Sequence, residues 1–176
     1  MSDRPAFRQL HEFEFDEVIM KKAMFFENAR LLYDGLGIVP LMYGSIGLEY
    51  ITNEALNADD VDILIPESFI IERWNEFCKF LTGNGYILLD EHEHTFCKNG
   101  ILYSYASIEE LKSFAGIGLS DIEQLCCNGI RFKLLSLDQY LKVYRASAKD
   151  GYRITVRKKK DNDKIAFIEK KLKIDR

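Results

Sequence analysis

The spacing of apolar residues along the chain changes between a helical period and short continuous runs. Apolar side chains recur every three or four residues before Gly35 and Gly37, which predicts a helix that these glycines end. Residues 38–43 and 60–65 are mostly apolar stretches of strand length, and residues 46–54 between them are expected to form a short helix. The predicted buried stripe of the first helix consists of Phe15, Ile19, Ala23, Phe26, Ala29 and Tyr33.

Later elements are marked by turn and capping signals. Pro66 opens one helix with an apolar stripe, and a last helix is expected over residues 160–173. Two type I′ turns are expected to join strands, at Asn99-Gly100 and Asn128-Gly129. Two capping boxes are expected to begin helices, at Ser107-Ile-Glu-Glu110 and Ser136-Leu-Asp-Gln139. Because helices and strands alternate early and hairpins follow, the predicted fold class is α+β, with helices packed on a mixed sheet.

The composition fits one domain over residues 1–176, with a basic helical segment from about residue 150. A chain of 176 residues, 47% of them hydrophobic, can bury a core without disulfides or a structural metal. No apolar run approaches the roughly 18 residues needed to span a bilayer, and charges stand where a signal peptide would be apolar. Four cysteines without C-x-x-C spacing suit reduced thiols. We therefore expect a cytoplasmic protein without a membrane partner.

The net charge of −4 conceals an asymmetry. Residues 142–176 carry 13 basic and 5 acidic side chains, whereas residues 1–141 carry 11 basic and 23 acidic ones. Solvated helix faces explain such numbers, and so does an acidic metal site that meets a basic phosphate-binding tail. We expect the two parts to meet at one site if the second explanation holds.

The residues with the clearest chemical pattern lie around the second predicted strand. Asp60 and Asp62 are two apart in a strand and project to the same face, where two carboxylates repel unless a cation lies between them. This donor set suits Mg²⁺ or Mn²⁺ during phosphoryl or nucleotidyl transfer. Gly44-Ser45, between a strand and a helix start, offers backbone N–H groups and a hydroxyl to a triphosphate. A simple turn and a strand-end acid explain either motif alone.

The order strand, Gly-Ser, short helix, acid-x-acid strand resembles the nucleotidyltransferase fold of polymerase β, CCA-adding enzyme head domains, antibiotic nucleotidyltransferases and AbiEii-type toxins. Residues 42–66 carry the resemblance. It implies that Gly44 and Ser45 contact nucleotide phosphates and that Asp60 and Asp62 ligate metal. Lys160-Asp161 is similar to a Lys-Asp pair in the C-terminal helices of AbiEii-like proteins, which makes Lys160 a further candidate for nucleotide binding.

Two features depart from the pattern of that fold. The family places a third carboxylate on a later strand, but residues 101–106 contain no acid, and Ser104 is expected at that position. Glu91 and Glu93 are the substitutes available from a neighbouring strand, and we prefer Glu93 as the third catalytic acid. The chain also leaves no room for the tRNA-binding parts of a CCA-adding enzyme, so a complete enzyme of that type is not expected.

Two other interpretations remain open. His92, His94 and Cys97 are spaced for a metal site, although zinc needs four ligands and only three candidates cluster. The basic residues Arg153, Arg157, Lys158, Lys159, Lys160 and Lys164 suit either a triphosphate or a nucleic-acid backbone.

The sequence thus predicts a Mg²⁺-dependent nucleotidyltransferase that uses a nucleoside triphosphate and an unidentified acceptor, which is a small molecule, a protein or RNA. The alternative is a catalytically degenerate member of the fold that acts as a nucleotide-binding or regulatory module.

Overall fold

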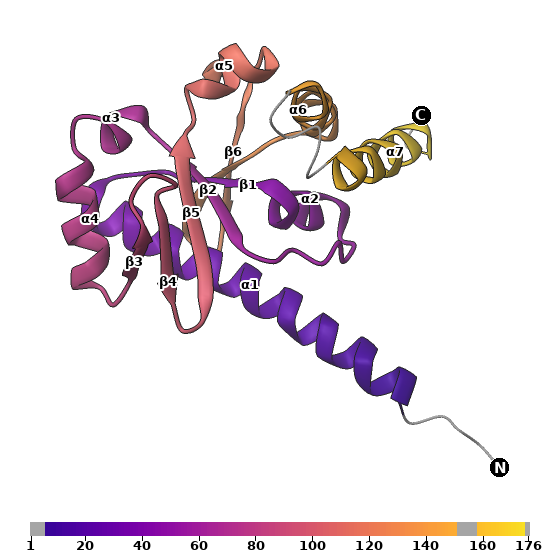
Figure 1. Cartoon of the computed structure of the whole chain (residues 1–176), viewed down its shortest axis with the longest axis horizontal. Coiled ribbons are helices and arrows are strands. Elements are labelled where there is room, and N and C mark those ends of the chain that lie inside the picture. Colours follow the sequence, from indigo (N-terminus) through magenta and orange to yellow (C-terminus); the bar gives the residue numbers. More distant parts are fainter. Residues whose placement is uncertain (1–5, 151–157, 175–176) are drawn as a thin grey trace.

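A seven-stranded mixed sheet organises the computed structural model, in the order β3-β4-β5-β2-β1-β7-β6 (Figure 1). The structure describes residues 6–150 and 158–174, with side chains over residues 19–150 and 159–174. The candidate phosphate contacts Arg153 and Arg157 lie outside the described residues. The strands are β1 Leu41–Tyr43, β2 Val61–Ile65, β3 Ile87–Asp90, β4 Thr95–Lys98, β5 Ile101–Ser107, β6 Glu123–Cys127 and β7 Ile130–Leu134.

Helices precede, interrupt and follow these strands. They are α1 Ala6–Leu36, α2 Gly44–Thr52, α3 Glu67–Ile70, α4 Trp74–Gly83, α5 Glu110–Ala115, α6 Leu137–Lys149 and α7 Lys158–Ile174, with a 3₁₀ turn at Leu119–Asp121. The predicted mixed α+β architecture is confirmed.

The centre of the sheet brings together strands that are distant in sequence. β1 runs antiparallel to β2 and parallel to β7, and β2 runs parallel to β5. The register pairs Asp62 with Tyr43 on one side and with Ser104 on the other. The start of β2 therefore lies in the middle of the sheet, between two strands that fix its position.

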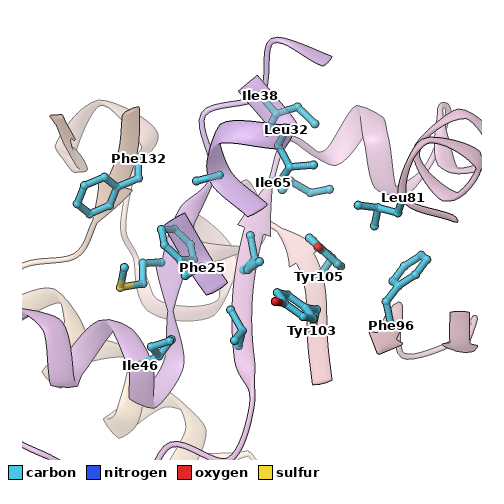
Figure 2. Close-up of a cluster of buried hydrophobic side chains, with 14 of the residues drawn as sticks. Phe25, Leu32, Ile38, Ile46, Ile65, Leu81, Phe96, Tyr103, Tyr105 and Phe132 are labelled. Atoms are coloured by element: carbon cyan, nitrogen blue, oxygen red, sulfur yellow. The ribbon is translucent and has the colours of Figure 1, made fainter. Parts of the chain in front are cut away.

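One face of the sheet is covered by a large aromatic and aliphatic core. Val61, Ile63 and Ile65 of β2 point into this core, which also contains Phe25 of α1 and Phe77 of α4. Figure 2 shows Tyr103 and Tyr105 of β5 within the same cluster, on the side of Phe96 and Leu81. These buried side chains fix β2 and β5 against the helices behind them.

The opposite face is covered by a second core. Leu41 and Leu64 contribute from the sheet, and they pack with Leu111 of α5, Tyr140 of α6 and Ile168 of α7. Figure 1 shows α6 and α7 side by side, near α2. Since β-strand side chains alternate, Asp62 lies on the same face as Leu64.

The predicted buried stripe of α1 is partly wrong. Ile19 is 51% exposed and Tyr33 is 38% exposed, whereas Phe25 and Leu32 are fully buried. The buried face of α1 also includes Asn28, whose side-chain amide donates hydrogen bonds to the hydroxyls of Tyr86 and Tyr105. A search for apolar spacing misses a buried face that contains a polar residue.

Two other local predictions also differ from the structure. The helix after Pro66 is divided into α3 and α4, and α5 begins at Glu110 without a capping box at Ser107. The Ser107 hydroxyl instead donates to the Glu109 carboxylate, at 3.1 Å.

Three local predictions are confirmed. The capping box at Ser136 begins α6, and positive φ angles at Asn99-Gly100 and Asn128-Gly129 fit type I′ turns.

Candidate functional site

Two acidic residues mark the start of β2: Asp62 lies on the strand, on the face that carries the second core, and Asp60 lies in the bend just before it. Val61 is fully buried on the first core, while Asp60 and Asp62 on either side of it are partly exposed. Strand alternation puts the Asp62 carboxylate on the face of Leu64, and Asp60 precedes Asp62 by two residues, about 6.6 Å along an extended chain. The acid pair that the sequence predicted therefore lies at the start of β2, in the middle of the sheet.

Gly44 lies directly against Asp62. Its φ of +63° is in the left-handed region, and a Cβ atom built there would lie 2.2 Å from Oδ2 of Asp62. No side chain can occupy this space unless Asp62 moves, so glycine is required both for the backbone conformation and for the close approach. Gly44 thus allows the first turn of α2 to lie next to the carboxylate.

Ser45, in the first turn of α2, is contacted from the C-terminal helix. The Lys164 ammonium of α7 donates a hydrogen bond to the Ser45 hydroxyl at 2.7 Å and lies over the ring of Tyr144, 5.0 Å from its centroid. The N-terminal end of a helix and a lysine thus meet at one hydroxyl. Both features favour an anionic group at this position.

Lys160 lies elsewhere on α7. Its side chain is 74% exposed, and its ammonium is 4.0 Å from the carboxylate of Asp59. The described structure therefore brings Lys164 to Ser45 and leaves the predicted nucleotide-binding Lys160 near the surface, next to Asp59. Position 164 is one helical turn after position 160, so the two lysines lie on the same side of α7, and the role of Lys160 stays a prediction.

Asp161 and Tyr144 hold α7 against α6. Asp161 is 5% exposed and accepts a hydrogen bond from the Ser147 hydroxyl at 2.7 Å. Burial raises the pKa of Tyr144, and the nearby Tyr43 and Asp62 raise it further, while the Ser45 hydroxyl partly opposes this rise. The Tyr144 side chain therefore borders the site and stays uncharged at physiological pH.

Glu49 is a functional candidate that the sequence analysis missed. It is fully buried in α2, and its Oε1 accepts hydrogen bonds from the backbone N–H groups of Leu56 and Ala58, at 2.8 and 3.0 Å. Lys21 of α1 donates to the carbonyl of the same Ala58. These contacts fix the loop that leads into Asp60. A buried acid in a helix of nine residues gives no periodic signal, which is why sequence reasoning did not find it.

Glu93 does not form a metal-binding group with the acid pair among the described residues. It lies in the turn between β3 and β4, its side chain is 72% exposed, and its carboxylate is 3.3 Å from His92. The residue opposite Asp62 is Ser104, as expected, and the Ser104 hydroxyl lies 3.3 Å from that of Thr95. His94 packs on Trp74, with ring centroids 4.6 Å apart. The third acid therefore stays a prediction without geometric support.

The donor set at β2 fits a hard divalent cation that shares its coordination with a substrate. Within the described ranges, no group of three or more Asp, Glu, His or Cys residues is arranged to hold a metal. Mg²⁺ is commonly bound by one or two carboxylates together with substrate phosphates. Asp60 and Asp62 meet that requirement, and the close approach of Gly44 leaves the first turn of α2 beside them.

Comparison with known proteins gives one relative in sequence and one in structure. The chain is 38% identical over 146 residues to the uncharacterized protein YnaI of Bacillus subtilis (strain 168), which covers 83% of this chain and 94% of the relative. The chain belongs to the YnaI family. No protein-family model matches the sequence.

The fold of this YnaI family member is nucleotidyltransferase-like. The structure is similar to the crystal structure of an antigenic nucleotidyltransferase-like protein from Paracoccidioides brasiliensis, with a TM-score of 0.58 and 16% identity. The similarity covers 87% of this chain and 75% of the other. The predicted fold is thereby confirmed. Within the residues that the structure describes, no helix is both long and apolar enough to cross a membrane.

Proposed function

We propose that this protein is a metal-dependent nucleotidyltransferase. The observation that carries the proposal is the convergence of three groups at the start of β2: the acid pair, the first turn of α2, and the Lys164–Ser45 contact of 2.7 Å. Carboxylates for a cation and a helix start with a lysine for phosphates form a complementary pair of subsites. The nucleotidyltransferase-like fold supports the same assignment.

In the proposed reaction, an acceptor hydroxyl attacks the α-phosphorus of a nucleoside triphosphate. The new bond joins the acceptor oxygen to the α-phosphorus, and the bond from that phosphorus to the oxygen bridging to the β-phosphorus breaks. Pyrophosphate leaves with that bridging oxygen, and the acceptor proton passes to water. Bound Mg²⁺ would stabilise the charge on the attacking and leaving oxygens.

The residues of the chain have separate tasks in this reaction. Asp60 and Asp62 hold the cation, while Ser45 and the N–H groups at the start of α2 hold the phosphates. Lys164 balances the charge that builds up as pyrophosphate leaves. Lys160, 74% exposed beside Asp59, is assigned a peripheral electrostatic contribution.

The second candidate function is nucleotide binding without transfer. It is favoured by one observation, which is that the β5 residue paired with Asp62 is Ser104 rather than an acid. Among the described residues no third carboxylate joins Asp60 and Asp62, so no carboxylate base is placed there to take the proton of the acceptor hydroxyl. The two functions differ only in turnover.

The test is a transfer assay with purified protein, Mg²⁺ or Mn²⁺, and each nucleoside triphosphate labelled at the α-phosphate. An extract that contains small molecules, RNA and proteins provides the acceptor. We expect the wild-type protein to release pyrophosphate and label one class of acceptor, and Asp62→Asn to do neither. Nucleotide binding without pyrophosphate release in any mixture would favour the second function, and no nucleotide binding would refute both.

A further inference from the structure

A pocket lies on the same face of the sheet as the acid pair, toward α5. Its volume is about 560 Å³, within the range of small-molecule sites. The lining residues come from the centre of the sheet and from α5: Tyr43, Leu64, Ala106, Ser107, Glu110, Leu111, Ser113 and Phe114. Figure 1 shows α5 following the end of β5, where it overhangs that edge of the sheet.

The register of the sheet relates this pocket to Asp62. Tyr43 is the β1 partner of Asp62, and Leu64 follows Asp62 by two residues on the same face, about 6.6 Å along β2. Because β1 runs antiparallel to β2, the chain after Tyr43 continues toward Asp60 and enters α2 there. The pocket and the Ser45–Lys164 contact therefore lie in opposite directions from Asp62 along the strand.

The lining of the pocket excludes the triphosphate as its occupant. It contains no lysine or arginine, and it includes the acidic residue Glu110. Glu110 is exposed, and its carboxylate has no hydrogen bond or ion pair with the described side chains, whereas Ser107 and Ser113 donate to Glu109 and to the Glu110 carbonyl. A polyanion would be repelled here, and a cation would be attracted.

The apolar part of the lining adds a second preference. Leu64 and Leu111 are buried, and Phe114 is 36% exposed at the edge of the pocket. An exposed aromatic ring beside buried aliphatic side chains suits a flat or compact apolar group.

We propose that this pocket binds the acceptor, and that the acceptor is a small molecule with a hydroxyl group, a compact apolar or aromatic body and a positively charged amine. The proposal rests on the nucleotidyltransferase function above. Phosphates on one side of Asp62 and an acceptor on the other would allow in-line attack across the metal site. A protein or RNA acceptor is excluded by the proposal and is an outcome of the test.

The first test compares three probes that differ in one group: octopamine, 4-hydroxyphenylglycol and 4-hydroxymandelate. They share a phenol ring and a benzylic hydroxyl, and they carry an ammonium, a hydroxyl and a carboxylate respectively. In NMR titrations of the ¹⁵N-labelled full chain, we expect octopamine to shift the amides of Ala106, Leu111 and Phe114 and to bind about threefold more tightly than the glycol, because Glu110 is partly screened by solvent. Equal affinity for all three, or shifts elsewhere, would overturn the proposal.

Variants separate the pocket from the nucleotide site. Phe114→Ala is expected to weaken octopamine binding about tenfold, and Glu110→Gln to remove the preference for octopamine over the glycol. Leu119→Ala is the matched control, since Leu119 is 43% exposed and does not line the pocket. All three variants should keep wild-type Mg²⁺-dependent nucleotide affinity. If nucleotide binds and octopamine does not, the acceptor proposal fails alone; if octopamine binds and nucleotide does not, the nucleotidyltransferase function fails.

The transfer assay tests whether the acceptor is RNA or protein instead of a small molecule. Label that appears in RNA or protein, at a rate unchanged by Phe114→Ala and Glu110→Gln, would also overturn the small-molecule acceptor.

Discussion

At the residue scale, the site depends on two close approaches that motif spacing alone does not reveal. Gly44 lies against Asp62 so closely that a Cβ atom would be 2.2 Å from its Oδ2, and Lys164 reaches Ser45 at 2.7 Å. The sequence located Gly44, Ser45 and the acid pair because strand alternation and a strand-to-helix turn constrain such residues locally. It did not single out the Lys164 contact with Ser45, because sequence spacing does not tell which turn of a distant helix lies against α2.

The two lysines provide a matched pair of variants. We expect Lys164→Met to weaken Mg²⁺-dependent nucleoside triphosphate binding about tenfold, since a charge-assisted hydrogen bond to phosphate contributes about 1.4 kcal/mol or more. Lys160→Met removes the same charge from the same helix at an exposed position and should change the affinity less than twofold. Isothermal titration calorimetry measures both. The opposite order of effects would restore Lys160 as the phosphate ligand.

At the element scale, the loop between α2 and β2 determines where Asp60 lies. Glu49 accepts hydrogen bonds from two backbone N–H groups of that loop, and Lys21 holds the Ala58 carbonyl from α1. The sequence predicted the helix and the strand on either side of the loop, because each has its own apolar pattern. It did not predict the contacts within the loop, because these depend on the tertiary packing of α1 and α2.

Glu49 should act as a positioning residue for the metal site. Glu49→Ala leaves one buried and one part-buried backbone donor without a partner, which is expected to lower the free energy of unfolding by about 2–4 kcal/mol and to weaken Mg²⁺-dependent nucleotide binding. Glu49→Gln keeps the Oε1 acceptor and should restore most of the binding. Urea denaturation and calorimetry on the same samples separate the two effects. A folded Glu49→Ala protein with wild-type metal-dependent affinity would show that Glu49 is only structural.

At the scale of the whole molecule, the acidic and basic parts of the sequence meet along α7. Lys164 contacts Ser45, Lys171 pairs with Glu54, and Lys160 lies near Asp59, so the basic helix follows α2 and the loop before β2. Composition shows that the basic residues are concentrated at the end of the chain, and the fold shows that they lie beside the acidic part. The helix brings positive charge to the edge of the site that contains the acid pair.

The fold class was predictable because the pattern of strands, hairpins and helices is local. Which helices cover each face of the sheet was not predictable from the sequence. β2 has buried apolar residues on one face and Asp62 and Leu64 on the other, and only the order of strands shows which helices cover each face. That order also brings the pocket under α5 next to the acid pair.

The most direct test of the account is calorimetric titration of each nucleoside triphosphate into the full chain, with Mg²⁺ and with EDTA. We predict binding that requires Mg²⁺ in the wild-type protein and no detectable binding in Asp60→Asn/Asp62→Asn, with an unchanged circular dichroism spectrum. Metal-dependent binding of equal affinity in the folded double variant would contradict the central claim that the acid pair of β2 holds the metal-bound nucleotide.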